Sequence, residues 1–467
     1  MTFSFSAISA TLLHIAIALA VTVHVLLYKR SVGAAIAWMG IVWLSPFVGG
    51  VLYFSFGINR VKRRARRLRN ERSHLFIVDE ASAGAGPADP MSPLEHAIGR
   101  LTGLPMESGN EVEVLRSGDE TYPSMLAAID GAVMSIGLST YIFRSDEEGT
   151  KFIDALVRAV GRGVEGRVLI DGVGSGYFWS GAYLKLRAAG VPVARFLHSY
   201  FPWRMPFVNL RNHRKLLVVD GRVGFAGGIN IGAENVLARD PPHPVRDTHF
   251  RLEGPVVEQL TEAFADDWLF VTGEKLMNAS WFGSIEPAGA IGARVITSGP
   301  DEDIEQIEFA AIHAISCARR SIRIVTPYFL PPEILTVALS LAAMRGVAVD
   351  LCMPEHSNHF VLDWARRVPL RALLEAGCRI SLSPAPFEHS KLMVVDDGWS
   401  LIGSANWDTR SFRLNFELDI EVHGADFATR LAGLIREGRR LTLGELDNEP
   451  ILFRLRNSAA RLLQPYL

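Results

Sequence analysis

Two copies of one short motif, at equivalent points of a duplicated chain, constrain this protein more than any other feature. The motif consists of a histidine, one variable residue, a lysine, four apolar residues and an aspartate. One copy would be weak evidence because these residue types are common, but two copies in register are hard to produce by chance. The copies are His213-Arg-Lys215-Leu-Leu-Val-Val-Asp220 and His389-Ser-Lys391-Leu-Met-Val-Val-Asp396.

The duplication extends beyond the motif and indicates the fold class. In the first half a strand-like run begins at Ser135, and a helix-like run ends at Gly163. In the second half the matching runs begin at Ser321 and end at Gly346. Strand and helix patterns that alternate in this way indicate βαβ units and a largely parallel sheet. We therefore predict an α/β protein built from two duplicated halves, residues 108–285 and 286–446.

The first half carries an insert that the second half lacks, within residues 196–207. It contains the aromatic residues Tyr200, Phe201, Trp203 and Phe207. Aromatic side chains suit both a buried loop and an apolar rim at a lipid interface, so both interpretations stay open.

The motif has a geometry that suits phosphoryl chemistry. On a β-strand, a histidine and a lysine two residues apart point to the same face, and the apolar run anchors the strand in the core. A Gly-Gly or Gly-Ser turn follows and allows close approach of the backbone to a substrate, and then an asparagine whose amide can donate to a phosphoryl oxygen. We predict four phosphate-binding residues on this basis: Gly228, Asn230, Ser404 and Asn406.

The N-terminus is apolar enough to enter a membrane. Residues 7–28 and 33–57 each provide the roughly 20 residues that a spanning helix needs, and Lys29 and Arg30 leave room only for a tight turn between them. We predict a transmembrane helical hairpin over residues 1–60. A signal peptide fits badly because residues 1–6 carry no positive charge, and a re-entrant second segment, broken at Pro46, is the other alternative.

The charge of the chain is unevenly distributed. Residues 1–72 sum to about +9 and the remainder to about −11, because eight basic residues lie between 60 and 72. The positive-inside bias places this run and the body behind it in the cytoplasm, against anionic headgroups. An acidic body binds a phosphate backbone poorly, which argues against nucleic acid as a partner.

Two further features bear on organisation and cofactors. Residues 61–107 hold the basic run and a Pro/Gly-rich stretch over 81–93, and we predict a flexible linker there. The three cysteines have no metal-ligand spacing. We therefore expect neither a metal nor another cofactor.

The paired motifs and their surroundings resemble the signature of the phospholipase D superfamily over most of residues 108–445. The resemblance implies two α/β halves, each a mixed sheet flanked by helices, that meet at a pseudo-twofold axis and form one active site. The catalytic residues that it implies are His213, Lys215, Asp220, His389, Lys391 and Asp396.

The resemblance also implies a mechanism. One imidazole attacks phosphorus to form a phosphohistidine, and the other protonates the leaving alcohol and then deprotonates the incoming one. By analogy His213 is the nucleophile and His389 the acid and base, although the near-symmetry of the motifs leaves the reverse assignment open. Lys215 and Lys391 supply positive charge to the phosphoryl oxygens.

Two pairs of carboxylates have different expected roles. Asp247 and Glu417 each open a strand after the asparagine of their half. Similar family carboxylates hold the catalytic histidine by a hydrogen bond, so we predict that this pair orients the histidines; an exposed acid at a strand end is the alternative. Asp220 and Asp396 are expected to fix the architecture or the field at the histidines rather than to take protons.

Three segments narrow the resemblance to bacterial cardiolipin synthases: residues 54–60, residues 326–331 and the C-terminal residues 464–467. Residues 447–467 also predict a basic amphipathic helix, which suits either a membrane interface or ordinary packing. The family implies transfer of a phosphatidyl group between two phosphatidylglycerol molecules in the bacterial inner membrane, giving cardiolipin and glycerol. It implies phosphatidylglycerol and other anionic lipids as partners.

Three alternatives remain at this point: a hydrolytic phospholipase D, a membrane-bound nuclease of the same superfamily, and a non-enzymatic membrane scaffold. All the enzymes of the superfamily share these motifs, so the motifs indicate the reaction rather than the substrate. The sequence does not determine the oligomeric state.

Overall fold

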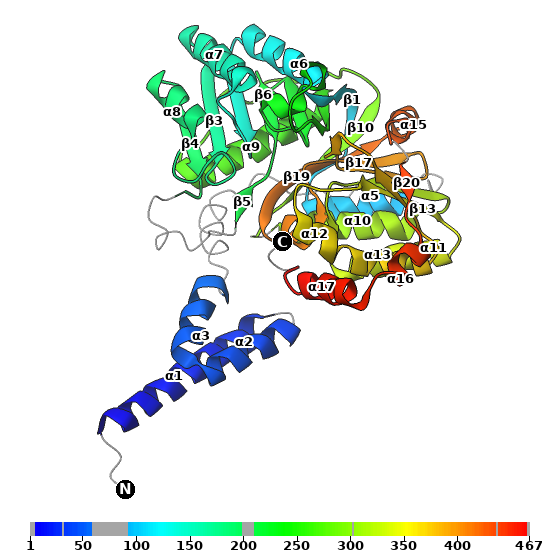
Figure 1. Ribbon diagram of the computed structural model, residues 1–467. Helices are drawn as coiled ribbons and strands as arrows, with labels where there is room; N and C mark the ends of the chain where they lie inside the picture. The colour runs from blue at the N-terminus through cyan, green and yellow to red at the C-terminus, as the bar shows by residue number, and fades with distance from the viewer. Residues whose placement is uncertain are drawn as a thin grey trace. The chain divides into compact units, whose positions relative to one another are not determined.

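A computed structural model describes residues 5–29, 32–57, 92–198, 210–300, 303–435 and 438–464. They belong to two compact units, an N-terminal helical unit and a larger α/β body, which Figure 1 shows with their labels. The predicted basic run at 60–72, nearly all of the Pro/Gly-rich stretch at 81–93 and most of the aromatic insert at 196–207 lie outside the described residues.

The described residues of the N-terminal unit form four helical segments. Thr11–Tyr28, within the first of them, is long and apolar enough to cross a membrane, in agreement with the first predicted span. His24 Nδ1 lies 2.7 Å from the Tyr53 hydroxyl, and Trp43 Nε1 donates to Thr22 Oγ1 at 3.1 Å, so polar contacts join the first helix to the segments that follow it. The segments are α1 (Phe5–Tyr28), α2 (Val32–Leu44), α3 (Pro46–Leu52) and the π-helical turn η1 (Tyr53–Gly57).

The second predicted span, residues 33–57, does not form one continuous helix. α2 ends at Leu44, and Pro46 starts α3 at its first turn, where the missing N–H of proline is tolerated. The 13 residues of α2 rise only about 20 Å, which is too short to cross the hydrocarbon core. α2 and α3 together cover most of the predicted segment, and its crossing of the membrane stays a prediction; the break lies at the proline that the sequence analysis named.

The body is organised around one 16-stranded mixed sheet. The order of strands is β20-β14-β13-β11-β16-β17-β19-β10-β1-β9-β7-β6-β2-β3-β4, with β5 attached to β19. Each half contributes one end of the sheet, and the antiparallel pair β1–β10 joins them at the centre. The strands are β1 (Glu107–Arg116), β2 (Ser135–Thr140), β3 (Glu165–Asp171), β4 (Val193–Phe196), β5 (Arg211–Asn212), β6 (Leu216–Val219), β7 (Val223–Gly227), β8 (Val245–Arg246), β9 (Thr248–Glu253), β10 (Ile291–Ser298), β11 (Ser321–Val325), β12 (Phe329–Leu330), β13 (Ala348–Pro354), β14 (Arg379–Ser383), β15 (Phe387–Glu388), β16 (Leu392–Val395), β17 (Trp399–Gly403), β18 (Trp407–Asp408), β19 (Asn415–His423) and β20 (Arg439–Arg440).

Apart from the short pair of β5 with β19, the sheet is parallel only where βαβ units build it. β2, β3 and β4 run parallel in one half, and β11, β13 and β14 do so in the other. The motif strands β6 and β16, with the strands that follow them, are joined by short turns and pair antiparallel. The largely parallel sheet read from the strand and helix pattern was therefore wrong, whereas the mixed sheet implied by the superfamily is confirmed.

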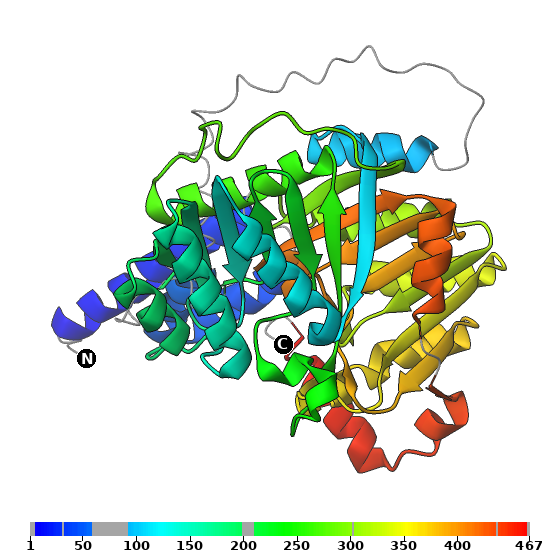
Figure 2. The same cartoon turned by 90° about the horizontal axis from the view of Figure 1, so that it is seen from above.

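Helices cover both faces of the sheet and enclose a separate apolar core in each half. Figures 1 and 2 show α6, α7 and α8 beside the strands of the first half, where α9 lies on the opposite face. α10, α11, α13 and α15 have the matching places in the second half. The helices of the body are α5 (Ser92–Thr102), α6 (Ser117–Gly131), α7 (Glu147–Gly161), α8 (Gly181–Ala188), η4 (Ala233–Asn235), η5 (Leu237–Arg239), α9 (Val256–Thr272), α10 (Gln306–Cys317), α11 (Glu333–Met344), α12 (Phe360–Ala365), α13 (Arg367–Glu375), α14 (Thr409–Arg413), α15 (Ala425–Gly433), α16 (Leu443–Asp447) and α17 (Ile451–Arg461).

The predicted linker covers residues 61–107, and its last part contains the packed helix α5 (Ser92–Thr102) rather than a flexible segment. Leu94 and Ile98 of α5 are fully buried in the core of the second half, and α5 packs along α10. The apolar spacing of this short helix was too weak to separate it from the Pro/Gly-rich stretch before it. The described part of the body therefore begins at α5.

Candidate active site

Each half sends the segment before its motif histidine across to the other half. β5, which precedes His213, pairs in parallel with the start of β19, and β15, which precedes His389, pairs in parallel with β8. The backbone N–H of His213 donates to Phe416 O at 2.9 Å, and that of His389 donates to Arg246 O at 2.7 Å. These short crossed pairings place His213 beside Glu417 and His389 beside Asp247, so each histidine lies next to a carboxylate of the opposite half.

Each histidine is hydrogen-bonded to a carboxylate of the other half. His213 Nδ1 lies 2.9 Å from Glu417 Oε2, and His389 Nδ1 lies 2.6 Å from Asp247 Oδ2. Both carboxylates are buried, with 0% and 1% of their surface exposed. They are not the exposed strand-end acids of the alternative interpretation. In both pairs Nδ1 is engaged, so Nε2 is the nitrogen that can meet a substrate.

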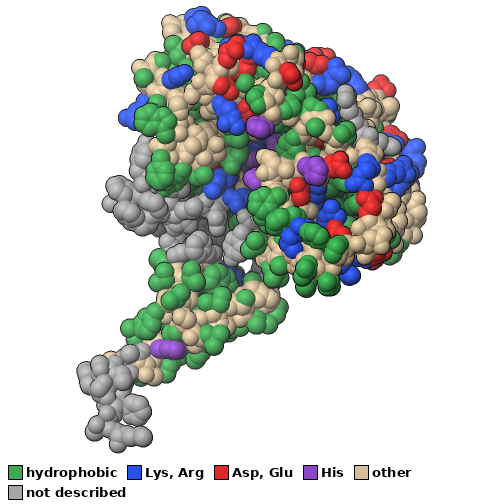
Figure 3. Space-filling view, viewed as in Figure 1, with side chains coloured by type: hydrophobic (Ala, Val, Ile, Leu, Met, Phe, Trp, Pro, Cys, Tyr) green, Lys and Arg blue, Asp and Glu red, His purple; other side chains and the backbone are tan. Residues whose placement is uncertain are grey.

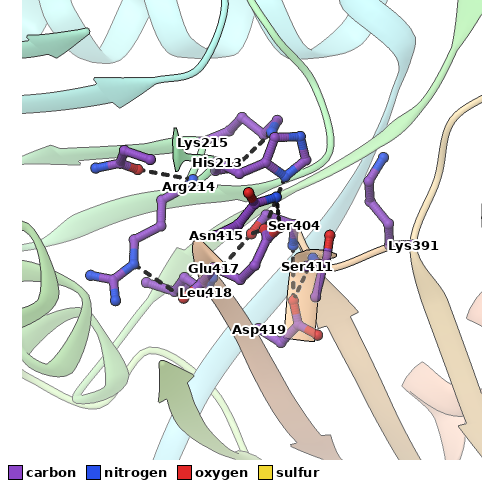
Figure 4. A network of polar contacts seen from close by, with 12 residues as sticks. His213, Arg214, Lys215, Lys391, Ser404, Ser411, Asn415, Glu417, Leu418 and Asp419 are labelled. Atoms are coloured by element: carbon purple, nitrogen blue, oxygen red, sulfur yellow. Dashed lines mark hydrogen bonds and ion pairs between the residues drawn. The ribbon is translucent and has the colours of Figure 1, made fainter. Parts of the chain in front are cut away.

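The two lysines lie with the histidines in one cluster. Lys215 Nζ donates to His213 O at 2.6 Å, and Lys391 Nζ lies 3.0 Å from His389 Nδ1. Figure 4 shows Lys391 of the second half facing the group formed by His213, Lys215 and Glu417. The motifs of the two halves therefore converge on one site, as the superfamily resemblance implied.

Burial and mutual charge set the protonation of the cluster. Burial lowers the pKa of His213 to about 4 against the pull of Glu417, and Lys215 and Lys391 lower it further. Burial, followed by the charge of Lys391, lowers the pKa of His389 to about 4 in the same way. Two neutral imidazoles at pH 7 suit nucleophilic attack, because only the unprotonated nitrogen carries a free lone pair.

The lysines and the carboxylates are also shifted. Burial lowers the pKa of Lys215 to about 7 and that of Lys391 to about 8. Burial opposes ionisation of Glu417 and Asp247, but the neighbouring histidines and lysines outweigh it and hold both carboxyl pKa values below their ordinary range. The carboxylates are thus ionised while the lysines titrate near neutral pH.

The glycine and serine of the two turns support the carboxylates. A Cβ on Gly228 would lie 2.2 Å from Asp247 Oδ1, so only glycine fits there. Ser404 Oγ donates to Glu417 Oε2 at 2.6 Å, and its predicted phosphate-binding role stays a prediction. Both residues therefore lie directly behind the histidine-bound carboxylates.

The two predicted asparagines differ in their contacts. Asn230 Oδ1 accepts a hydrogen bond from the Ile142 N–H at 3.2 Å. Asn406 Oδ1 is buried and has no hydrogen-bond partner among the described residues. A phosphoryl oxygen accepts hydrogen bonds and would therefore be met by the Nδ2 groups, not by Oδ1, so these contacts do not separate the two asparagines and their phosphate-binding role stays a prediction.

Asp220 and Asp396 lie at the far ends of the motif strands and not in the cluster. β6 separates Lys215 from Asp220, which adopts a left-handed backbone conformation with φ 53°. Its carboxylate accepts the backbone N–H groups of Val133, Met134 and Ser135, and that of Asp396 accepts those of residues 319–321. These contacts match the architectural role expected for the pair and give neither residue a contact with a catalytic side chain.

Sequence reasoning missed several residues that hold the site. The Tyr141 ring lies edge-on to His213 with centroids 4.9 Å apart, and Tyr328 lies edge-on to His389 at 6.2 Å. Buried Arg214, the variable residue of the first motif, bonds to Asp267 Oδ1 at 2.9 Å and to Glu417 O at 3.1 Å. The two tyrosines do not stand at matching places in the repeat: Phe143 and Phe329 are equivalent, beside Ile231 and Trp407, so Tyr141 matches Pro327 and Tyr328 matches Ile142.

A duplicated α/β body with two crossed histidine–carboxylate pairs and two lysines defines a phospholipase D-like enzyme. Two family models match this chain: "Cardiolipin synthase, PLD-like domain" over residues 125–268 and 311–437, and "Phospholipase D-nuclease N-terminal" over residues 16–57. The cardiolipin synthase of Geobacillus thermodenitrificans is 35% identical over 94% of this chain and 90% of its own length. The chain belongs to the cardiolipin synthase family of phosphatidyltransferases.

One further relative agrees with this assignment, and one solved structure shares the fold. The major cardiolipin synthase of Bacillus subtilis is 33% identical over 94% of this chain and 95% of its own length. The crystal structure of phosphatidylserine synthase from Haemophilus influenzae covers 80% of this chain with a TM-score of 0.62 at 16% identity, which shows that the fold is shared. The N-terminal apolar helix and the family together make this a membrane-associated enzyme.

Proposed function

We propose that this enzyme transfers the phosphatidyl group of one phosphatidylglycerol to a second one, giving cardiolipin and glycerol through a phosphohistidine intermediate. The observation that carries the proposal is the crossed pair of histidine–carboxylate contacts, His213 with Glu417 and His389 with Asp247. Two oriented imidazoles suit a two-step exchange, because one can hold the phosphatidyl group while the other moves protons.

In the first step His213 Nε2 attacks the phosphorus of the donor lipid. The N–P bond forms as the bond from phosphorus to the glycerol oxygen breaks, and the leaving oxygen takes a proton from His389 Nε2. Binding of the anionic phosphodiester raises the pKa of His389, since an opposite charge favours the imidazolium. Lys215 and Lys391 stabilise the charge that develops on the phosphoryl oxygens.

In the second step the headgroup hydroxyl of another phosphatidylglycerol attacks the same phosphorus. Its proton passes to His389 Nε2, the new O–P bond forms, and the N–P bond to His213 breaks. The enzyme returns to its starting state, so no cofactor is consumed. Asp247 and Glu417 stabilise the positive charge that each imidazole carries during the cycle.

Product analysis by mass spectrometry, with the full chain and phosphatidylglycerol vesicles, tests this proposal. We expect cardiolipin and an equal amount of glycerol, and neither product from His213→Ala. Phosphatidic acid as the sole lipid product would show a hydrolase instead. A donor lipid with a nitrophenol leaving group needs no general acid to release it. The His389→Ala variant should therefore accumulate a covalent adduct on His213 with this donor. An adduct on another residue would reverse or refute the assignment of His213 as the nucleophile.

We further propose that the active site lies on the cytoplasmic side of the inner membrane. The basic run at 60–72 supports this orientation through the positive-inside bias. α1 would cross the bilayer, and α2 and α3 would lead the chain back toward the cytoplasmic side. They would do so as a broken segment, because Pro46 interrupts the helix. Fusing a reporter active only in the cytoplasm to the C-terminus tests the orientation, and an inactive reporter would contradict it.

We also propose that α17 contacts the membrane surface. Its apolar residues Leu452 and Leu455 are 74% and 59% exposed, while its buried face holds Asn457 and Ala460. This pattern favours the interfacial helix over the packing helix, since the apolar stripe is not used for packing. Quenching of a fluorophore at position 455 by lipids with labelled acyl chains would support the contact, and full solvent exposure in vesicles would refute it.

A further inference from the structure

Two large aromatic side chains project into solvent from residues 172–180, the loop between β3 and α8, which we call the aromatic loop. Phe178 and Trp179 are 71% and 77% exposed, although the backbone that carries them is well held. Arg195 Nη2 donates to Gly172 O at 2.8 Å and to Tyr177 O at 3.0 Å. Exposing two neighbouring large apolar side chains to water costs free energy, so the pair indicates a surface that an apolar partner covers.

The base of the aromatic loop is attached to the His213 side of the active site. Asp171 Oδ2, at the end of β3, accepts the backbone N–H of Asn212 at 2.9 Å, directly before His213 in the chain. Ser175 Oγ donates to Tyr141 O at 3.1 Å, and the ring of Tyr141 lies edge-on to that of His213. The aromatic loop therefore borders the site at the histidine that we propose as the nucleophile.

The matching loop of the second half, which follows β13, has the same two properties. It ends at Phe360, which is 63% exposed. Within it, Asn358 Oδ1 accepts a hydrogen bond from the Tyr328 hydroxyl at 2.5 Å, and the Tyr328 ring lies edge-on to that of His389. Exposed aromatic side chains therefore border both histidines. Figure 3 shows hydrophobic side chains on either side of the hollow in which histidines gather.

The chemistry of the surface next to Phe360 indicates which partner covers it. Phe360 is the first residue of α12, and α17 packs along α12. α17 exposes Leu452 and Leu455, and its 11 residues include three arginines and no acidic residue. Exposed apolar side chains beside arginines fit a surface of anionic phospholipid, because they can meet acyl chains and headgroups together. A lipid surface is also the partner at which a membrane-associated enzyme of this family finds its substrate.

We infer that the aromatic loop inserts Phe178 and Trp179 into the lipid surface and, with Phe360 on the other side of the site, holds the mouth of the active site against the bilayer. This inference rests on the proposed transfer between lipids. Tryptophan suits such a position, because its ring is apolar and its N–H can reach the headgroups. The donor phosphate can then reach His213 while its acyl chains stay in the bilayer, and the covered mouth limits the access of water to the adduct.

Quenching of a fluorophore by lipids with brominated acyl chains tests the insertion, with the full-length enzyme in phosphatidylglycerol vesicles. The label is attached at Phe178→Cys or Trp179→Cys, and the wild type treated with the same reagent corrects for labelling of Cys317, which is half-buried. Val133→Cys is the matched control, because Val133 is 75% exposed and lies beside Asp220, at the far end of the motif strand. We expect at least about twofold quenching at positions 178 and 179, as insertion to the acyl boundary implies, and none at position 133.

The rate of cardiolipin formation in the same vesicles shows whether the insertion serves the reaction. Replacing Phe178 and Trp179 together by serine should lower this rate at least about tenfold, as the loss of one buried large apolar side chain implies, and Val133→Ser should keep the wild-type rate. Fluorescence at positions 178 and 179 that brominated lipids leave unchanged, or a wild-type rate in the double variant, would overturn the inference. A wild type that forms only phosphatidic acid, with the label still quenched, would instead refute the proposed transfer and leave the insertion standing.

Discussion

Replacing Glu417 by glutamine should nearly abolish turnover while leaving the fold intact. The carboxylate is fully buried and lies 2.9 Å from His213 Nδ1. A hydrogen bond to a charged group contributes about 1.5–3 kcal/mol, which corresponds to about 10–150-fold in rate. A glutamine amide can also donate to Nδ1 and stabilise the tautomer that carries its proton on Nε2, and a tautomer error of this kind costs up to about 10⁴-fold. We therefore expect kcat to fall by about 10² to 10⁴.

The assay is the initial rate of cardiolipin formation in phosphatidylglycerol vesicles, with thermal unfolding to check the fold. Ser404→Ala is the graded control, because it removes only the neutral hydroxyl that donates to the same oxygen at 2.6 Å. That loss should slow the enzyme about 2–10-fold. If Glu417→Gln were no slower than Ser404→Ala, the carboxylate would not orient the imidazole, and the reasoning would fail.

Three further predictions concern pH, stability and metals. The pKa values of Lys215 and Lys391 are lowered to about 7 and about 8. Both lysines therefore lose their charge as pH rises, and kcat/KM should fall above about pH 7 to 8. The fall of kcat should occur at higher pH, because a bound phosphate raises the lysine pKa values. A pH–rate profile flat to pH 10 would contradict this. Asp220→Ala leaves three backbone N–H groups without their acceptor. The free energy of unfolding in urea should therefore fall by roughly 1–3 kcal/mol, while kcat of the folded enzyme stays nearly unchanged. A large loss of kcat without a loss of stability would return Asp220 to the catalytic residues. EDTA should leave activity unchanged, because lysines supply the positive charge at the phosphoryl group, and inactivation that added metal reverses would count against this mechanism.

Much of the site could be predicted because its chemistry lies in local patterns. Histidine and lysine two residues apart on a strand necessarily share a face, and the duplication made the second copy recognisable. The partner of each histidine could not be predicted in the same way. His213 and Glu417 are 204 residues apart, and only the crossed pairing of β5 with β19 shows that each histidine uses the carboxylate of the other half.

The remaining differences have physical causes of the same kind. The sequence did not predict that the Ser404 hydroxyl meets the buried carboxylate of Glu417, because such a contact leaves no mark in local sequence. The mixed sheet departs from βαβ expectations because the turns after β6 and β16 are too short for a crossover. The second apolar segment is broken at Pro46, and length and hydropathy alone do not predict where such a helix breaks.

The exchange of short strands between the halves has an evolutionary and practical consequence. Two identical single-motif chains could form the same contacts by dimerising, so tandem fusion of a symmetric pair would preserve the catalytic arrangement while freeing each copy to mutate separately. Arg211 opposite Phe387, and Arg410 opposite Glu234, are differences that no homodimer could hold. Each half as a monomer would lack the carboxylate that its histidine needs, and mixing the two fragments would restore the native pairing of each histidine with the carboxylate of the other half.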